Sequence, residues 1–592
     1  IASCLVGSEM CIRDSINTTL RLNYDLSSLL TKGLSVHGSI AYDSYYYSRK
    51  KYSKTFPYYL ARRDAEDPDY IYLIPQSEES IWSVSTGWDK NRKVYMEFGI
   101  DYNRTFGLHK TTALILYNQS KYYSPSLQYY VPNAYQGLVG RLTYEYASRY
   151  LAEFNMGYNG TENFAKGKRF GFFPAVSLGW VISEEKFFPK NNIVKYLKVR
   201  GSYGEVGNDQ IGGDRFLYLP SSYGAASDSG VNKYNFGLAS NPYTSLMIVE
   251  NKIGNPDLTW EKAKKMNVGV DINLFNNCLT ASFDIFKEKR NNILANRSTS
   301  PMIIGANLPA YNFGEMENRG WEMDLNFRHH IQDFHYWARF NYSFARNEII
   351  YMDEVQKRYD YQMTTGRRKN QFFGLIFDGY YNSWEEINAL DRPKSSWSGN
   401  QLQPGDVKYV DVNQDGVIDD YDMVPIGYTP VPEIIYGFSF GAQYKGFDFS
   451  ILFQGADNVS IKYFGRSMWP FAKGEESAKS LIKERWTQER SEAGEKITFP
   501  RLSLNPNGET DHNYRPSTLW IRDASYLRLK NLEVGYTFTG GFVKRLNLNS
   551  VRLYFNGSNL FTWTDVVDLD PEAPSRSGNV EINTYPLQKV YN

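Results

Sequence analysis

The chain has 592 residues, with 66 Lys and Arg against 65 Asp and Glu, so its formal net charge is +1. This balance excludes a basic field for nucleic acid and an acidic tail. An aromatic content of 16% excludes intrinsic disorder, and the sequence holds no apolar run long enough for a transmembrane helix. The length fits several domains or one large closed architecture, and the 48 Tyr and 46 Gly favour β structure.

The two ends of the chain differ in character from the rest. Residues 9–15, with the sequence EMCIRDS, resemble the translation of a transposase adapter used in sequencing libraries. We therefore interpret residues 1–15 as a sequencing-adapter artefact and exclude them from fold reasoning. We also expect a native N-terminal part to be missing and a last strand, beginning at Tyr585, to be cut off at Asn592. The three cysteines, Cys4, Cys11 and Cys278, cannot make a paired disulfide framework.

From Ile16 onward, apolar and polar residues alternate along the chain. This period of two places apolar side chains on one face of an extended strand and polar ones on the other. The runs last about ten residues, which suits a tilted membrane-spanning strand. The predicted strands, in chain order, cover residues 17–27, 33–43, 94–105, 111–118, 135–147, 151–159, 172–182, 195–204, 263–274, 279–289, 314–327, 334–346, 433–444, 447–455, 524–538 and 550–560.

Connections between these strands alternate between short turns and long segments. The longest segments cover about 43–93, 205–262, 347–432 and 456–523. Up-and-down barrels of outer membranes have short periplasmic turns and long extracellular loops. In a β-sandwich or a β-propeller, short and long connections are not expected to lie at opposite ends of the strands. The sequence therefore predicts an all-β protein, a transmembrane antiparallel up-and-down β-barrel that occupies residues 16–592.

Several segments, in the order of a known family, resemble the C-terminal barrel of SusC/RagA-type TonB-dependent outer-membrane transporters. They are residues 173–180, 197–204, 254–261, 312–320, 411–416, 519–529, 551–561 and 585–586. The resemblance covers nearly all of 16–592. It implies part of a 22-stranded barrel whose N-terminal plug is absent from this chain. It also implies import of oligosaccharides or peptides in the outer membrane of a Gram-negative bacterium, with a SusD-like lipoprotein and with TonB, which would act through the missing N-terminal region.

An Asp-rich segment carries the sharpest local motif. Side-chain oxygens of Asp411, Asn413, Asp415, Asp419 and Asp422 occupy positions 1, 3, 5, 9 and 12 of a calcium loop, with Gly416 at position 6 and the Val417 carbonyl at position 7. This spacing predicts a structural Ca²⁺ or Mg²⁺ in an extracellular loop. Position 12 holds Asp where Glu is usual, and the alternative is an Asx-rich turn whose side chains cap their own backbone.

No catalytic constellation is present: the sequence has no nucleophile elbow, no HExxH and no Walker loop. We therefore expect a transporter rather than an enzyme. The alternation places Asp271, Asp284, Glu322 and Asp324 on the inward face, where they would line the lumen or hold a plug. The first alternative is a passive porin or ligand-binding surface barrel without TonB energisation. A second alternative is a secreted glycan-active enzyme.

Overall fold

The structure is a computed structural model of the chain. It describes residues 5–64, 66, 67, 69–210, 215–220, 224, 225, 233–238, 243–246, 248, 249, 253–299, 308–397, 402–463, 469–471, 480–503, 511–567, 569–572, 579, 580 and 587–592.

The chain divides into two compact units. The first unit comprises Ile1–Ala147, Ala152–Val176 and Gly207–Trp260, and the second comprises Ser148–Leu151, Ser177–Val206 and Glu261–Asn592. Within the described residues, seventeen strands belong to the main antiparallel sheet. None of the helices in this part of the chain is both long enough and apolar enough to cross a membrane.

The first unit is a meander in which β1, β2, β5, β6 and β7 pair in that order. A small hairpin, β3–β4, connects β2 to β5. Two further pairs of short strands lie in the connection that follows β10. The strands are β1 (Leu5–Asp25), β2 (Leu34–Thr55), β3 (Tyr59–Arg63), β4 (Ile71–Pro75), β5 (Ser83–Phe106), β6 (His109–Tyr123), β7 (Asn133–Tyr146), β8 (Tyr150–Thr161), β9 (Phe170–Val181), β11 (Gly224–Ala225), β12 (Lys233–Phe236), β13 (Tyr243–Leu246) and β14 (Ile248–Val249).

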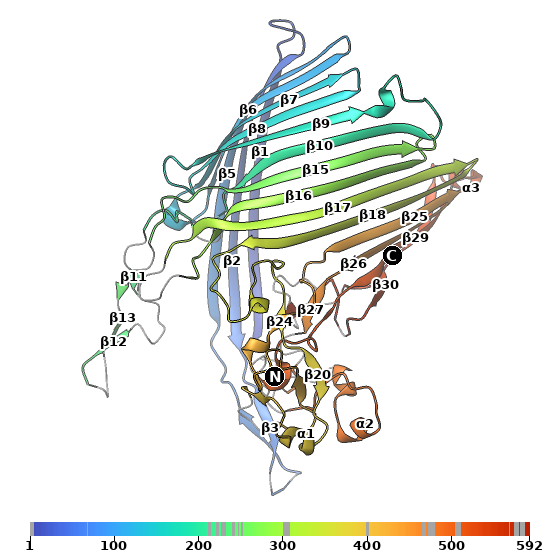
Figure 1. The fold of residues 1–592 in the computed structure, drawn as a ribbon. Coiled ribbons are helices and arrows are strands. Elements are labelled where there is room, and N and C mark those ends of the chain that lie inside the picture. Colours follow the sequence, from blue (N-terminus) through green and yellow to red (C-terminus); the bar gives the residue numbers. More distant parts are fainter. Residues whose placement is uncertain are drawn as a thin grey trace. The chain divides into compact units, whose positions relative to one another are not determined.

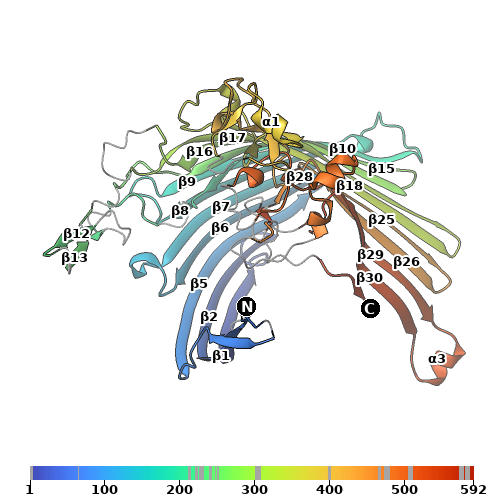
Figure 2. The ribbon, with the colours of Figure 1, turned by 90° about the horizontal axis from the view of Figure 1, so that it is seen from below.

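The second unit has the same up-and-down pattern, and its long strands follow one another in chain order in Figures 1 and 2. Its long strands are β10 (Val194–Asn208), β15 (Glu261–Leu274), β16 (Leu279–Ala295), β17 (Tyr311–Ile331), β18 (Phe334–Tyr351), β25 (Ile434–Tyr444), β26 (Phe447–Asp457), β29 (Tyr526–Phe538) and β30 (Val551–Thr564), and the short β32 (Val590–Tyr591) pairs with β30.

Short elements fill the long connections of the second unit. They are β19 (Phe373–Gly374), β20 (Phe377–Tyr380), β21 (Lys394–Ser395), β22 (Val407–Tyr409), β23 (Val417–Ile418), β24 (Val424–Pro425), β27 (Ser460–Tyr463), β28 (Ile521–Asp523), β31 (Asn579–Val580), α1 (Trp384–Asn388), α2 (Gln488–Glu492) and α3 (Gly541–Arg545). Single turns of 3₁₀ helix occur in both units, at Gln128–Tyr130, Ile182–Glu184, Asp360–Gln362, Asp420–Asp422, Ser480–Glu484 and His512–Tyr514.

The register of the second unit sorts side chains by face. Val268 lies beside Ile285 and Ile285 beside Trp321, and the first two are more than half exposed (55% and 57%). On the other face, Ser282 lies beside both Asp271 and Asp324. Because successive side chains of a strand point to opposite faces, one face of this sheet is apolar and exposed while the other is polar. This is the arrangement of a sheet with one face toward lipid.

The predicted strands all have counterparts in the structure, and the short turns lie where they were expected. The structure differs at the outer ends. The segment predicted as a loop at 43–93 is partly strand, because Asp43 pairs with Lys93 and the β2–β5 ladder continues to Ser53 and Ser83. Residues 5–15, which we excluded from the fold, continue β1 along β2. This pairing does not test their origin, so the adapter interpretation stays a prediction. Parts of the predicted loop at 205–262 lie outside the described residues.

Two predicted loops of the second unit, 347–432 and 456–523, fold together around a hydrophobic core. Leu375 and Val407 from the first loop, and Phe499 and Trp520 from the second, are almost completely buried in it. Burying large aromatic and aliphatic side chains contributes about 2 kcal/mol for each of them. These segments therefore form one folded assembly, which we call the loop domain.

Candidate functional site

The inward face of the second unit carries a charged network built on three strands. The Arg200 guanidinium on β10 donates to both oxygens of Asp284 on β16, at 2.7 Å each. Its Nε donates to Asp271 on β15 at 3.1 Å, and the Ser282 hydroxyl donates to the same carboxylate at 2.8 Å. A guanidinium that binds a carboxylate with two parallel bonds fixes its orientation. Two of the four inward residues predicted from sequence, Asp271 and Asp284, are thus held together by Arg200.

A hollow of about 890 Å³ lies on the same face, between the inward side chains of β16, β17, β18, β25 and β26. Most of its lining is polar, and it includes a third predicted residue, Asp324. The lining includes Thr280, Asp324, Asn326, Asn341, Ser439 and Ser450. The fourth predicted residue, Glu322, lies beside Asp284 in the register. Hydroxyl, amide and carboxylate groups on one face suit contact with water and polar solutes.

A buried polar network ties the two halves of the loop domain together. The Asn513 side chain accepts from the backbone N–H of Val407 at 2.9 Å and donates to Asp406 at 2.8 Å. The Trp520 indole N–H donates to the Asn513 carbonyl at 2.8 Å, and Arg501 Nε donates to Asp406 at 2.6 Å. Because these buried groups satisfy one another, the network fixes one arrangement of the two loops.

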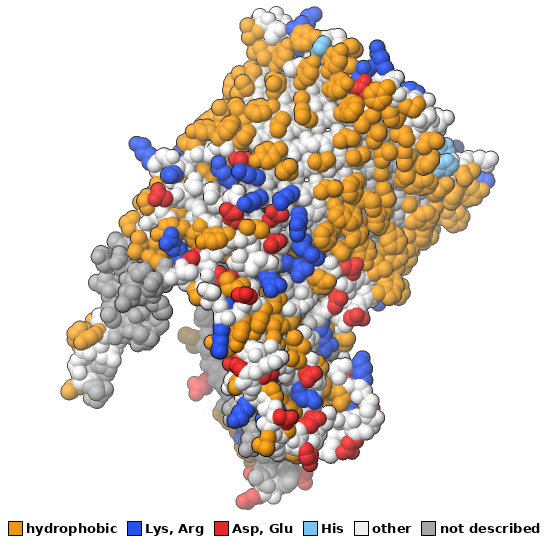
Figure 3. Space-filling model, viewed as in Figure 1, with side chains coloured by type: hydrophobic (Ala, Val, Ile, Leu, Met, Phe, Trp, Pro, Cys, Tyr) orange, Lys and Arg blue, Asp and Glu red, His pale blue; other side chains and the backbone are white. Residues whose placement is uncertain are grey.

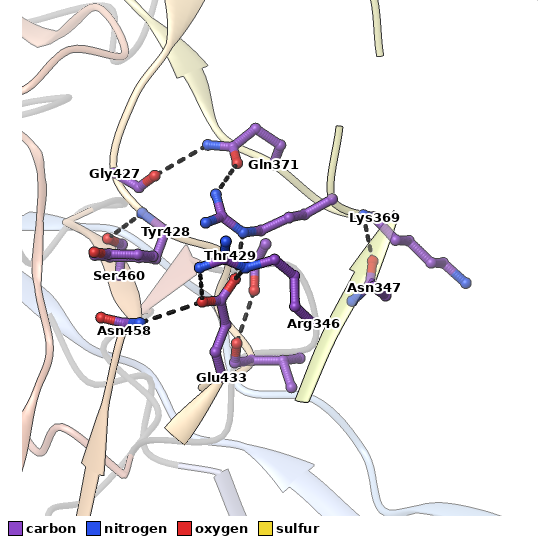
Figure 4. Close-up of polar contacts among 12 residues, drawn as sticks. Arg346, Asn347, Lys369, Gln371, Gly427, Tyr428, Thr429, Glu433, Asn458 and Ser460 are labelled. Carbon is purple, nitrogen blue, oxygen red and sulfur yellow. Dashed lines mark hydrogen bonds and ion pairs between the residues drawn. The ribbon is translucent and has the colours of Figure 1, made fainter. Parts of the chain in front are cut away.

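Glu433, just before β25, anchors the loop domain to the strands (Figure 4). Its side chain is almost completely buried, and Arg346 of β18 donates to both of its oxygens, at 3.0 and 2.8 Å. Arg368 from the loop domain also donates to this carboxylate, as does Asn458 at 3.2 Å. Burial would raise the pKa of Glu433, but the bond from Arg346 and the charges of the two guanidinium groups outweigh it and lower that pKa. Glu433 is therefore ionised and connects three segments.

The contacts around Glu433 continue into the backbone of the loop domain. Gln371 donates to the carbonyls of Ile426 and Gly427 at 2.9 and 3.2 Å, and the Tyr428 N–H donates to the Ser460 hydroxyl at 2.9 Å. Segments far apart in sequence are thereby fixed at one end of β18 and β25.

A buried arginine, Arg528, holds the segment after β30. Arg528 of β29 is 2% exposed and donates to Asp570 at 2.6 Å and to Glu572 at 3.3 Å. The Tyr526 hydroxyl donates to Glu572 at 2.7 Å. Burial would raise the pKa of Asp570, but the bond from Arg528 and two backbone N–H groups lower it overall. The segment is thereby fixed against the inward side chains of β29.

The Asp-rich segment predicted to hold a cation lies in the loop domain as a series of tight turns. Asp411 accepts from the Gly416 N–H at 2.8 Å, and Asn413 accepts from the Asp415 N–H at 2.9 Å. Asp415 accepts from the N–H of Val417, the first residue of β23. The bonds to Asn413 and Asp415 are those of Asx turns, in which a side chain caps the backbone two residues further on, and the bond to Asp411 closes the loop over five residues.

The end of the same segment is a capped 3₁₀ turn. Asp419 accepts from the Tyr421 N–H at 2.7 Å, and the fully buried Asp422 accepts from Asp419 and Val412 at 2.8 Å each. Burial raises the pKa of Asp422, because the backbone bonds only partly offset the loss of water. One oxygen, Oδ1 of Asp411, is buried without a hydrogen-bond partner in the described part of the chain. In that part, no three His, Cys, Asp or Glu side chains come together as metal ligands.

Sequence reasoning missed Glu433, Arg528 and Asn513, the residues that hold the loop domain and its neighbouring segment in place. Arg528 stands between Leu527 and Leu529 in a strand, whereas Asn513 lies in a polar run with Asp511 and His512. For Arg528, the available signal was a charge between two apolar residues of a strand, and Glu433 and Asn513 had no such local signal.

Comparison with known proteins identifies the family of this chain. A family model described as "TonB dependent receptor-like, beta-barrel" matches residues 12–560. The chain belongs to this family. Its members are outer-membrane proteins, and so is this chain; the family is one of receptors and transporters rather than enzymes.

Curated relatives agree with the family. The chain is 29% identical over 450 residues to TonB-dependent receptor P3 of Formosa agariphila, covering 74% of this chain and 42% of that protein. It is 28% identical over 469 residues to TonB-dependent receptor SusC of Bacteroides thetaiotaomicron, covering 78% of this chain and 43% of SusC. The chain thus spans less than half the length of these relatives.

Solved structures show the same fold. A chain of the RagAB peptide importer in its "open-open" state matches with a TM-score of 0.72 at 20% identity, over 99% of this chain and 61% of that one. The "closed-closed" state of RagAB matches with a TM-score of 0.71, also at 20% identity, over 99% of this chain and 62% of that one. The expected fold, part of a large TonB-dependent β-barrel, is confirmed.

Proposed function

We propose that the protein imports oligosaccharides or peptides across the outer membrane, energised by TonB and together with a SusD-like surface lipoprotein. Two similar proteins support this proposal: one is named SusC, and a structural neighbour is described as a peptide importer. The observation that carries the proposal is the inward face of the second unit. There the Arg200–Asp271–Asp284 network lies on the same face as the polar hollow. Such a face suits the passage of polar, hydrogen-bonding solutes.

An uptake assay tests this proposal. Cells that express the full-length gene, or lack it, are supplied with labelled oligosaccharides and with labelled peptides, each in a background with and without TonB. We expect uptake of one of the two classes to require both the gene and TonB. Uptake that requires the gene but is unchanged without TonB would contradict the proposal and favour a passive porin.

We also propose that the Asp411–Asp422 segment binds Ca²⁺ or Mg²⁺ as a structural ion. Support comes from the ligand spacing and from the buried, unpartnered oxygen of Asp411. Asp411, Asn413 and Asp415 would hold the cation, with the Val417 carbonyl, Asp419 and Asp422 completing its shell. The ion would supply positive charge among carboxylates and stiffen the loop domain.

Thermal unfolding with and without added calcium tests the ion. Binding stabilises the folded state by about 2.7 kcal/mol at a concentration 100 times the dissociation constant, so the midpoint should rise with Ca²⁺ and return with EDTA. Asp411→Asn should abolish the rise, whereas Asp391→Asn, outside the segment, should keep it. If neither Ca²⁺ nor Mg²⁺ changed the unfolding midpoint of the wild-type protein, the ion proposal would be wrong and the segment would be an Asx-rich turn.

A further inference from the structure

The apolar outward face of the second unit ends in a row of cations. In the register, Ile285 of β16 lies beside Trp321 of β17, which lies beside Phe344 of β18. Two residues further along each strand, and so on the same face, the neighbours are Lys287, Arg319 and Arg346. Figure 3 shows Lys and Arg side chains, with Asp and Glu side chains among them, along the border of the apolar field.

Three neighbouring cations on one face are an unfavourable arrangement. Side chains directly opposite each other on paired strands lie roughly 5 Å apart at their Cβ atoms, and like charges there are destabilising. Lys287 is paired with Glu317 at 2.9 Å, and Arg346 with the buried Glu433. Arg319, between them, is exposed and has no ion pair with any described residue. The middle of the row therefore has an unbalanced positive charge.

The next row carries two cations and two acids, because Glu317 lies beside Lys289 and Glu348 lies beside Glu317. Lys264 of β15 lies beside Lys289 of β16, and both are about half exposed (45% and 43%). Their acidic partners are Glu205, at 3.9 Å from Lys264, and Glu315, at 2.8 Å from Lys289. The second row therefore adds no net positive charge, and Arg319 is the cation of the first row without an acidic partner among the described residues.

Below these rows the face is apolar and aromatic. Val268, beside Ile285, is 55% exposed, and the Trp321 ring stacks on Tyr342 with centroids 4.8 Å apart. Since this chain is an outer-membrane protein, those side chains meet acyl chains, and the row two residues above them meets lipid headgroups. Lys and Arg at that level can place their stems along apolar surface and their charged ends at the interface.

We propose that Arg319, which lies between Lys287 and Arg346, binds the phosphate group of an anionic membrane lipid whose acyl chains lie along Ile285 and Trp321. Arg319 supplies a planar fork of donors that matches phosphate geometry, whereas the charges of its two neighbours are balanced by Glu317 and Glu433. The phosphate offsets the repulsion within the row. The site is independent of the solute that the protein imports, because it lies on the face opposite the polar hollow.

Lipid binding to the purified protein in a neutral detergent tests the site. The probes are monophosphorylated lipid A, the same lipid without its phosphate, and inorganic phosphate alone, with retention measured by native mass spectrometry. We expect the phosphorylated lipid to bind at least tenfold more tightly than the dephosphorylated one. Arg319→Gln should weaken that binding about tenfold, and Arg319→Lys should recover part of it.

The matched control is Arg328→Gln, the same residue type on the same strand but on the opposite face, and it should leave lipid binding unchanged. Equal loss in the Arg319→Gln and Arg328→Gln variants would overturn the proposal, because the effect would then be one of net charge alone. Equal binding of both lipids would overturn it as well. Inorganic phosphate that competes at the concentration of the lipid would instead identify a site for a soluble anion.

Discussion

At the scale of single residues, the structure depends on ion pairs between residues that are far apart in sequence. Glu433 binds Arg346, 87 residues earlier, and Arg368, 65 residues earlier. No local motif indicates an ion pair between residues so far apart, so Glu433 could not be predicted from the sequence. The Asp-rich segment is different, because its groups lie within twelve residues, and spacing alone located it. Spacing did not settle whether the oxygens face an ion or their own backbone.

Glu433→Gln should loosen the loop domain. Glutamine keeps the shape but removes the negative charge that two guanidinium groups share, and breaking a buried ion pair costs about 3 kcal/mol. Hydrogen exchange measured by mass spectrometry should show faster exchange in residues 347–371, with the strand ladders unchanged. Glu492→Gln, an exposed change at the end of α2, is the control and should leave exchange as in the wild type. Unchanged protection in Glu433→Gln would contradict the anchoring role.

The same anchor should depend on pH. Because the pKa of Glu433 is lowered in the folded state, its contribution is present above the ordinary carboxyl value of about 4.3 and is lost as pH falls through the lowered pKa. Limited proteolysis of the wild type should therefore show the loop domain opening in that acidic range. In Glu433→Gln this part of the pH dependence should be absent.

At the scale of elements, alternation predicted every long strand but not where the strands end. In β17 the apolar row through Trp321, Met323 and Leu325 is continuous, and its prediction was accurate. In β2 the strand continues past Asp43 through Tyr45 and Lys50, where the period of two is lost. Beyond the membrane both faces of a strand can meet water, so no burial enforces alternation there. The strand extensions could therefore not be predicted.

The turn between β25 and β26 gives a test at this scale. Lys445 and Gly446 both have positive φ, 44° and 93°, as a two-residue hairpin requires. A Cβ on Gly446 would lie 2.8 Å from the Thr537 carbonyl oxygen. We expect Gly446→Ala to cost about 2 kcal/mol and to lower the amount of assembled protein in outer-membrane fractions. Gly541→Ala, at the start of α3 where the added carbon meets nothing, should assemble normally. Equal yields of the two variants would contradict the prediction.

At the scale of the whole molecule, alternation and the sorting of loops along the entire chain predicted the class of fold. The resemblance of segments such as 173–180 and 519–529 to SusC/RagA-type transporters predicted the family. It did not predict that residues 347–432 and 456–523 fold around one core. Their core residues, such as Leu375 and Trp520, come from irregular segments without periodicity. Core residues that come from two distant loops show no periodic pattern in the local sequence, so this core could not be predicted.

The central claim is that one face of these strands meets lipid and the other meets water, and thiol labelling along β17 tests it most directly. Single cysteines replace Met323, Leu325, Glu322 and Asp324 in a protein whose own cysteines are changed to serine. An environment-sensitive maleimide is attached to each, in outer-membrane vesicles with spin-labelled lipids. We predict quenching by lipid at 323 and 325 and none at 322 and 324. Equal quenching at all four positions, or at none, would contradict the account.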